Sequence, residues 1–339
     1  MKKIFAVLML LVMTVTLAGC GKDKDKVDEY TAENPLVLNF GYVVGTDDAA
    51  HLAAVDFKEA IEEESEGRVE VKLYANGELG DDTAVLEAIL LGDVQITSCA
   101  TSPMSGYDAK LTLTELPYLY DDFDSMDEAM TGDVYELVKP WYADVGFELF
   151  GFNYDGTREL SNNVRPIYTL DDCKGLKLRA MDSPSHIATL ECLGANAIPM
   201  GYGDIYTGLQ QGTVDGQDNP PALTYTSKFN EVLKYFSLTD MIMSNSPVVM
   251  SKKIFDGYPE DIQEMIRKHL VATQVTWQRG AQREAELDYI KKIDESGCEV
   301  NEIEDMEEFK KAMDPVYEKA KEDYGEEVYN EFLKAANHK

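Results

Sequence analysis

The pattern of apolar and polar positions over residues 36–100 predicts alternating strands and helices. The stretches LVLNFGYVV, RVEVKLYA and VQITSCA are short and apolar or alternating, as strands are. Between the first two, apolar residues recur at helical spacing at positions 50, 54, 57 and 61. Between the last two, TAVLEAILLG predicts a helix whose N-cap is Asp81 or Asp82. The predicted order is therefore β-α-β-α-β.

The same order of elements returns from Leu176 onward, without sequence identity between the two copies. LKLRA, NAIPM and TVDGQ are predicted strands, separated by a helix over 184–193 and by the helix GDIYTGLQQ, which ends at Gly212. Two such units predict an α/β fold with two lobes, each a parallel-centred sheet with helices on both faces. The cleft between the lobes is the natural place for a ligand.

Beyond Met250 the chain is acidic and predicted to be helical, with helical spacing maintained over residues 259–297. Such a helix can run across both lobes as a spine or wrap a single lobe, and the pattern alone leaves both arrangements open. We expect the first lobe to comprise residues 36–155 with about 245–283. The second lobe is then expected to comprise residues 156–244 with about 284–339.

The first nineteen residues are typical of a secretory signal peptide, with two lysines followed by an apolar run. The ending LAGC resembles a bacterial lipobox, which predicts cleavage before Cys20 and acylation of its thiol. A plain transmembrane anchor is the alternative, although the run is short for one. Residues 20–35 are mostly charged and end in proline, so we expect a flexible tether between the lipid and the first lobe.

The formal net charge of −32 argues against binding to nucleic acid or to an anionic lipid surface. The sequence lacks GxSxG, Walker, GxGxxG and HExxH motifs, and its four histidines are scattered. The cysteines after Cys20 form no CxxC pair, which speaks against a zinc site, while their spacing leaves a disulfide open. We therefore expect a protein that is not an enzyme and that carries neither metal nor cofactor.

Arg179 is the first candidate for ligand binding, because it ends the alternating strand LKLRA just before a predicted helix. Ser183 is a good N-cap for that helix, with Pro184 at its first position. Arg179 therefore lies at the carboxyl end of a strand, where open α/β sheets bind their ligands. A guanidinium there offers a rigid fork of donors to a carboxylate.

Three further residues are candidates for the cleft. Arg158 follows the turn signal YDG near the junction of the lobes and can meet a carboxylate together with Arg179. Asn219 precedes a proline, which favours an extended backbone that presents its amide. Tyr202 precedes a helix start and can form an aromatic wall. The plainer alternatives are an internal salt bridge for either arginine, a turn role for Asn219 and core packing for Tyr202.

Taken together, the segments VKLYANGELGDD, GTRELSNNVRPIYTLDDCKGLKLRAMDSPSH and LGANAIPMGYGDIYTGLQQGTVDGQDNP resemble the solute-binding proteins of tripartite ATP-independent periplasmic (TRAP) transporters. The resemblance implies two α/β lobes with a long spanning helix, and a bidentate salt bridge from Arg179 to the solute carboxylate. It also implies hydrogen bonds from Arg158 and Asn219 and an aromatic contact from Tyr202. The positions that it places near the rest of the solute are His51, Thr97, Ala100 and Thr101.

The resulting prediction is an extracytoplasmic lipoprotein that binds a small organic acid and delivers it to a TRAP-type membrane permease. The acid is a sugar acid such as a uronate, or a C4-dicarboxylate. The polar candidates His51, Thr101, Asn153 and Asp218 suit a hydroxylated solute slightly better. A sensory module and an extracellular enzyme are the alternatives, and we expect a monomer.

Overall fold

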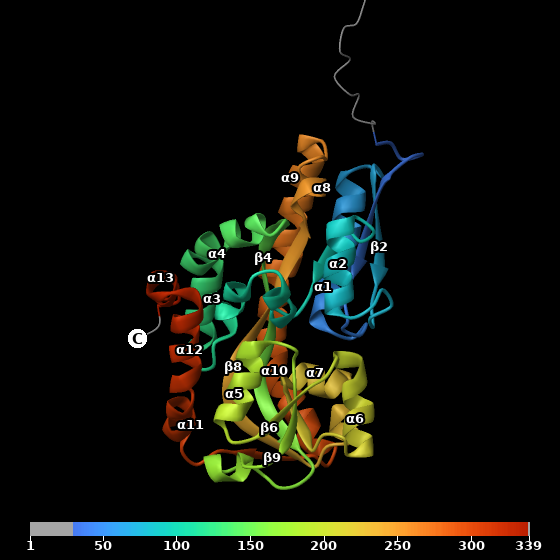
Figure 1. Cartoon of the computed structure of the whole chain (residues 1–339). Coiled ribbons are helices and arrows are strands. Elements are labelled where there is room, and N and C mark those ends of the chain that lie inside the picture. Colours follow the sequence, from blue (N-terminus) through green and yellow to red (C-terminus); the bar gives the residue numbers. More distant parts are fainter. Residues whose placement is uncertain (1–29, 338–339) are drawn as a thin grey trace, which may run out of the picture.

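The computed structural model describes residues 30–337, so the predicted signal peptide and Cys20 lie outside the described residues. Its strands form one sheet in the order β2-β1-β3-β8-β4-β7-β5-β6, with β9 paired to β8 (Figure 1). The strands are β1 (Leu36–Gly41), β2 (Val69–Tyr74), β3 (Ile96–Ser98), β4 (Phe147–Asn162), β5 (Lys177–Ala180), β6 (Asn196–Pro199), β7 (Gly216–Asn219), β8 (Tyr235–Ser251) and β9 (Glu299–Glu302).

The two β-α-β-α-β units form the two lobes of this α/β fold, as the sequence predicts. β1 pairs in parallel with β2 and β3 in the first lobe, and β5 pairs in parallel with β6 and β7 in the second. The expectation of two separate parallel sheets is wrong. The long strands β4 and β8 pair with each other and run through both lobes, and β3 and β7 join them antiparallel.

The helices cover both lobes (Figure 1). They are α1 (Ala49–Glu64), α2 (Asp82–Leu91), α3 (Phe123–Thr131), α4 (Asp133–Asp144), α5 (Pro184–Cys192), α6 (Ile205–Gln211), α7 (Pro221–Thr226), α8 (Lys252–Phe255), α9 (Glu260–Leu270), α10 (Gln278–Glu295), α11 (Met306–Ala312), α12 (Asp314–Tyr324) and α13 (Glu326–Ala335). The predicted boundaries are confirmed at three positions. Asp81 caps α2 by accepting a hydrogen bond from Ala84, Ser183 is the N-cap of α5, and Gly212 ends α6 in the left-handed conformation.

The spanning helix is confirmed as well. α9, a π-helical segment (Val271–Trp277) and α10 follow one another without a break from residue 260 to residue 295. α9 packs on α1 of the first lobe. α10 also contacts α1, but it packs mainly on α7 of the second lobe and on β4 between the lobes, and it reaches β9 as well. The C-terminal helices return across the molecule, since α12 packs on α5 and α13 on α4.

A row of buried polar side chains attaches this helix to β4. Gln274, Gln278, Gln282 and Glu286 follow at intervals of four residues and are each at most 5% exposed. Gln274 accepts from the Asn153 side chain, Gln278 bonds both backbone groups of Tyr154, Gln282 donates to the Asp155 carbonyl and Glu286 accepts from the Thr157 amide. The bonds of Gln278, Gln282 and Glu286 satisfy backbone groups beside the β-bulge in the middle of β4, and all four side chains hold this part of the strand to the helix.

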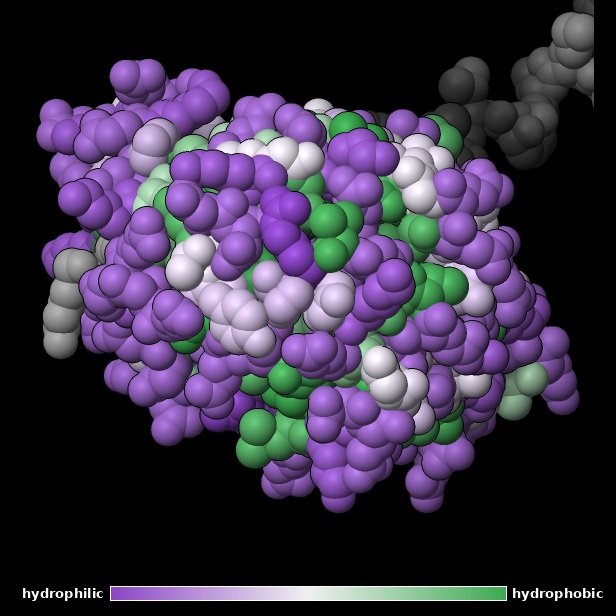
Figure 2. Space-filling view, turned by 90° about the horizontal axis from the view of Figure 1, so that it is seen from below, coloured by the Kyte–Doolittle hydropathy of each residue, from purple (hydrophilic) through white to green (hydrophobic). Residues whose placement is uncertain are grey.

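The hydrophobic core of residues 30–337 consists of three clusters, one in each lobe and one around the long strands and the C-terminal helices. Phe40 and Phe57 belong to the core of the first lobe, under α1 and α9. Leu209 and Phe236 belong to the core of the second, and the largest cluster lies around β4, α4 and the C-terminal helices. The surface at the end of the molecule that carries β6 and β9 is mostly hydrophilic, with small hydrophobic patches (Figure 2). Among residues 30–337, no helix is long and apolar enough to span a membrane.

Candidate functional site

A cavity of about 380 Å³ lies between the two lobes. Its wall combines the N-terminus of α2 and the end of β3 from the first lobe, the ends of β5 and β7 from the second, and the middle of β4 and β8. The polar lining residues are Asp81, Asp82, Thr83, Ser98, Ser105, Asp155, Arg158, Arg179, Asp182, Tyr202, Asn219, Ser244 and Ser246. The cavity therefore brings together four residues predicted from the sequence, namely Arg158, Arg179, Tyr202 and Asn219.

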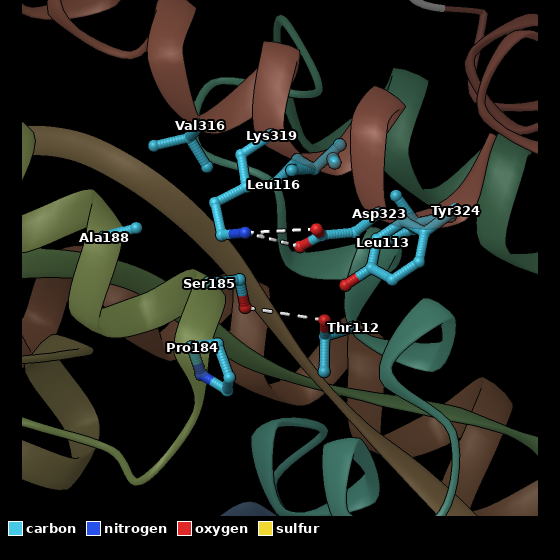
Figure 3. A pocket seen from close by; sticks show the side chains of 11 residues that line it. Thr112, Leu113, Leu116, Pro184, Ser185, Ala188, Val316, Lys319, Asp323 and Tyr324 are labelled. Carbon is cyan, nitrogen blue, oxygen red and sulfur yellow. Dashed lines mark hydrogen bonds and ion pairs between the residues drawn. The ribbon is translucent and has the colours of Figure 1, made fainter. Parts of the chain in front are cut away.

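Two other hollows among residues 30–337 hold none of the predicted residues. A groove of about 840 Å³ runs between α3, β8 and the C-terminal helices. A crevice of about 30 Å³ lies between α5 and α12, where Lys319 pairs with Asp323 and Ser185 donates a hydrogen bond to Thr112 (Figure 3). That volume is close to what a single water molecule needs.

Arg179 is 4% exposed and reaches the cavity from the end of β5. Its Nε donates a hydrogen bond of 2.9 Å to the carbonyl oxygen of Met200, and among the described residues its guanidinium forms no ion pair. Burial, and next the nearby charge of Arg158, lower the pKa of Arg179 to about 10, which still leaves the side chain protonated at neutral pH. Its terminal nitrogens thus present a positive charge that has no carboxylate partner in the described chain.

Arg158 behaves differently, because it takes part in an internal salt bridge. Its Nε lies 2.8 Å from Oδ2 of the fully buried Asp218, and its NH2 group donates to the backbone oxygen of Asp218 and to Oδ1 of Asn219. Burial by itself would lower the pKa of Arg158, but the charge and the hydrogen bond of Asp218, together with the charges of Glu115 and Asp155, outweigh burial and raise the pKa. A β-bulge follows Arg158 in β4. Bulges commonly change the direction of nearby side chains.

His186, near the start of α5, holds Asp218 from the other side. Its Nδ1 accepts a hydrogen bond from the Met181 amide, so its Nε2 carries the proton and donates to Oδ2 of Asp218 at 2.8 Å. Burial lowers the pKa of His186, which favours this neutral form. For Asp218, burial alone would raise the pKa, but Arg158 and His186 hold it well below its usual range. Asp218 is therefore an ionised anchor that orients Arg158.

Tyr202 and Asn219 complete this side of the cavity. The Tyr202 hydroxyl lies 2.5 Å from Oγ of Ser227, and its ring packs edge-on against Phe229. Asn219 ends the strand β7, which agrees with the extended backbone predicted from the following proline, and its amide nitrogen donates to Gln217. The second lobe thus fixes two guanidinium groups, one phenol and one amide at the same cleft.

The wall contributed by the first lobe and the middle strands is acidic. Asp82 accepts a hydrogen bond from the Ala100 amide through Oδ2, while its other oxygen, Oδ1, is buried and has no hydrogen-bond partner within residues 30–337. Asp155 accepts from Ser246 at 2.7 Å. Burial raises the pKa of Asp82 to about 7. The hydrogen bond from Ala100 opposes this rise, and the charge of Asp155 adds to it. Burial also raises the pKa of Asp155.

Five other residues named from the sequence stand as follows. Ala100 lines the cavity, whereas Thr97, Thr101, Asn153 and His51 are not among its lining residues. Thr97 and Thr101 bond backbone carbonyls of Gly41 and Asn245, and Asn153 bonds Ser98 and Gln274. His51 is half-buried, with Nδ1 2.8 Å from the Tyr42 hydroxyl. In this structure these four polar side chains have internal partners.

Sequence reasoning missed the carboxylates of the cavity and the histidine behind it. The sequence presents Asp82 only as a helix cap and Asp155 only as part of a turn. The available signal for Asp82 was its place at a helix N-terminus that follows a strand, on the cleft side of an α/β lobe. No local signal marks His186, which meets Asp218 only because β5 and β7 are neighbours in the sheet.

The buried carboxyls make the stability of the ligand-free protein depend on pH. Mainly because of burial, the pKa values of Asp48, Asp82 and Glu115 are each raised to about 7. A carboxyl whose pKa is higher in the folded than in the unfolded state stabilises the fold at pH values below about 4, and this contribution is lost as the pH rises through about 7. We expect Asp82→Asn to reduce the fall in unfolding free energy between about pH 5 and pH 8.

Chemical denaturation at several pH values measures this slope. Glu87→Gln, an exposed change on the same helix, is the control and is expected to keep the wild-type slope. A slope that is equally steep in Asp82→Asn and in the wild type would show that Asp82 is already ionised in the folded protein well below pH 7.

This fold and this cleft define a class of protein: a two-lobed binding protein whose inter-lobe cavity presents a buried guanidinium with no ion pair in the part of the chain that the structure describes. Residues 40–323 match the family described as bacterial extracellular solute-binding protein, family 7, and the chain belongs to that family. The resemblance to the solute-binding proteins of TRAP transporters is thereby confirmed.

Named relatives agree with this membership. The chain is 30% identical to the 2,3-diketo-L-gulonate-binding periplasmic protein of Escherichia coli, over 81% of this chain and 84% of that one. It is 31% identical to the C4-dicarboxylate-binding periplasmic protein of Vibrio cholerae, over 90% and 92%. The sugar acid binding protein of Advenella mimigardefordensis, solved with galactonate, superposes with a TM-score of 0.86 at 30% identity, over 89% and 98%.

Proposed function

We propose that the protein captures a small organic acid, either a sugar acid or a C4-dicarboxylate, in the cavity between its lobes. Arg179 binds the carboxylate of the acid through its two terminal nitrogens, with Arg158, Asn219 and Tyr202 beside it. One observation carries this proposal. Arg179 is buried and charged, yet has no ion pair among the described residues, and such a group gains most from an arriving carboxylate.

The proposal extends to how the protein is used. Cleavage before Cys20 and lipidation of its thiol attach it to the outer face of the membrane. The tether predicted over residues 20–35 then ends at Tyr30, which already packs against the core of the first lobe. From the membrane surface the protein delivers the acid to the membrane subunits of a TRAP-type permease. Support comes from the LAGC sequence and from the relatives, several of which are named as TRAP periplasmic solute-binding proteins.

A ligand panel tests the binding step. Purified protein from about residue 24 onward is heated with sugar acids, dicarboxylates, keto acids, amino acids and neutral sugars. An acid at about 100 times its dissociation constant is expected to stabilise the folded state by about 2.7 kcal/mol, which raises the melting temperature by a few degrees. A response to a neutral sugar or a peptide, with none to any acid, would refute the proposal.

A further inference from the structure

The cavity between the lobes is polarised, and this polarity bears on the kind of acid it accepts. Two guanidiniums, Arg158 and Arg179, lie on the wall that the second lobe completes. Asp82 faces the same cavity from the N-terminus of α2, and Asp155 from β4. The charge of Arg179 is among those that influence Asp82, which places the two groups within electrostatic reach of each other.

A charge balance leaves room for a single ligand carboxylate. Arg158 is already neutralised by Asp218 at 2.8 Å. Arg179 is therefore the cation of this cavity that is left to pair with a ligand. A second ligand carboxylate would have to lie against Asp82 and Asp155, where the cavity lining offers no further lysine or arginine. Like charges brought together in a buried site repel strongly.

The acidic wall also has unused capacity to accept hydrogen bonds. The Oδ1 atom of Asp82 is buried and has no partner among the described residues. Asp155 is already approached by a serine hydroxyl, from Ser246. An ionised carboxylate can only accept, so its natural complement is a hydroxyl or another donor on the ligand. A donor that reaches Asp82 would satisfy an atom that is otherwise costly to keep buried.

Resting on the function proposed above, we infer that the ligand is a polyhydroxylated monocarboxylate, whose hydroxyl groups donate to Asp82 and Asp155 while its carboxylate binds Arg179. Dicarboxylates of similar size are rejected by the same two aspartates. Asp82 and Asp155 are thus specificity-determining residues, and Arg179 supplies affinity for any acid. The cavity of about 380 Å³ has room for an acid of sugar size.

Isothermal titration calorimetry at about pH 8, above the pKa of about 7 to which burial raises Asp82, tests the inference. The probes are galactonate and glucuronate on one side and succinate and malate on the other. We expect the wild type to bind at least one of the hydroxylated acids about 100-fold more tightly than either dicarboxylate. Asp82→Asn is expected to weaken that binding by about 10- to 100-fold and to strengthen succinate binding, so that the preference narrows.

Glu87→Gln on the same helix is the matched control and keeps the wild-type preference. Asp155→Asn provides a second variant in case Asp82→Asn, at the start of α2, fails to fold. Dicarboxylate binding as tight as sugar-acid binding in the wild type would overturn the inference while leaving the proposed function intact. So would a selective response to a zwitterionic amino acid, whose ammonium group would then be the donor. Failure of every acid to bind would instead overturn the proposed function.

Discussion

Replacing Arg179 with alanine is expected to weaken binding of the acid by about 100- to 1000-fold. Removing one partner of a buried charge pair commonly costs about 3 to 5 kcal/mol, and a micromolar ligand has only about 8 kcal/mol of binding free energy in all. Arg179→Lys is expected to weaken binding of the acid nearly as much as Arg179→Ala does. An ammonium group is a single point charge, whereas the guanidinium fork matches both carboxylate oxygens.

Calorimetry with the acid found in the ligand panel measures this loss. Arg68→Ala is the control, because Arg68 forms an exposed ion pair with Asp261 and does not line the cavity. The folded state of Arg179→Ala is expected to remain intact, since the removed guanidinium had one hydrogen bond and no ion pair among the described residues. Unchanged affinity in this variant would rule out the proposed salt bridge.

Much of the fold could be predicted because each lobe is built from short units with clear local signals. Asp81, Ser183 and Gly212 mark helix ends by their own chemistry, and the structure has the ends there. The long strands β4 and β8 could not be recognised in this way. Nearly every residue of β4 is buried, so the strand lacks the alternation of a sheet with one exposed face.

In the candidate site, too, residues with a local signal could be predicted and long-range contacts could not. Arg179 could be identified because it ends a predicted strand, and the carboxyl ends of strands are where α/β sheets bind ligands. This signal does not depend on contacts with distant parts of the chain. The partners of Arg158 were not identifiable. Asp218 lies sixty residues further along, and His186 approaches it only after β5 and β7 have paired. Whether an arginine is neutralised within the fold or left for a ligand depends on such long-range contacts, which periodicity and spacing do not contain.

This difference between the two arginines gives the second large prediction, which concerns stability. Asp218→Asn is expected to lower the free energy of unfolding by about 3 to 5 kcal/mol. The substitution leaves Arg158 buried, at 2% exposure, without its salt-bridge partner, and it replaces the charged acceptor for Nε2 of His186 with a neutral amide oxygen. Asp182→Asn is the control, because Asp182 lines the same cavity but is exposed. Both variants are compared with the wild type by chemical denaturation.

A double variant then separates stability from binding. Replacing both partners of a buried ion pair by apolar residues of similar size is often neutral or stabilising, because no uncompensated charge remains. Arg158→Met with Asp218→Leu is therefore expected to recover most of the stability lost in Asp218→Asn. It is not expected to recover affinity for the acid, because Arg158 also lines the cavity beside Arg179. If the double variant instead bound the acid as the wild type does, the Arg158–Asp218 pair would serve the fold alone, and Arg179 would hold the carboxylate without help from Arg158.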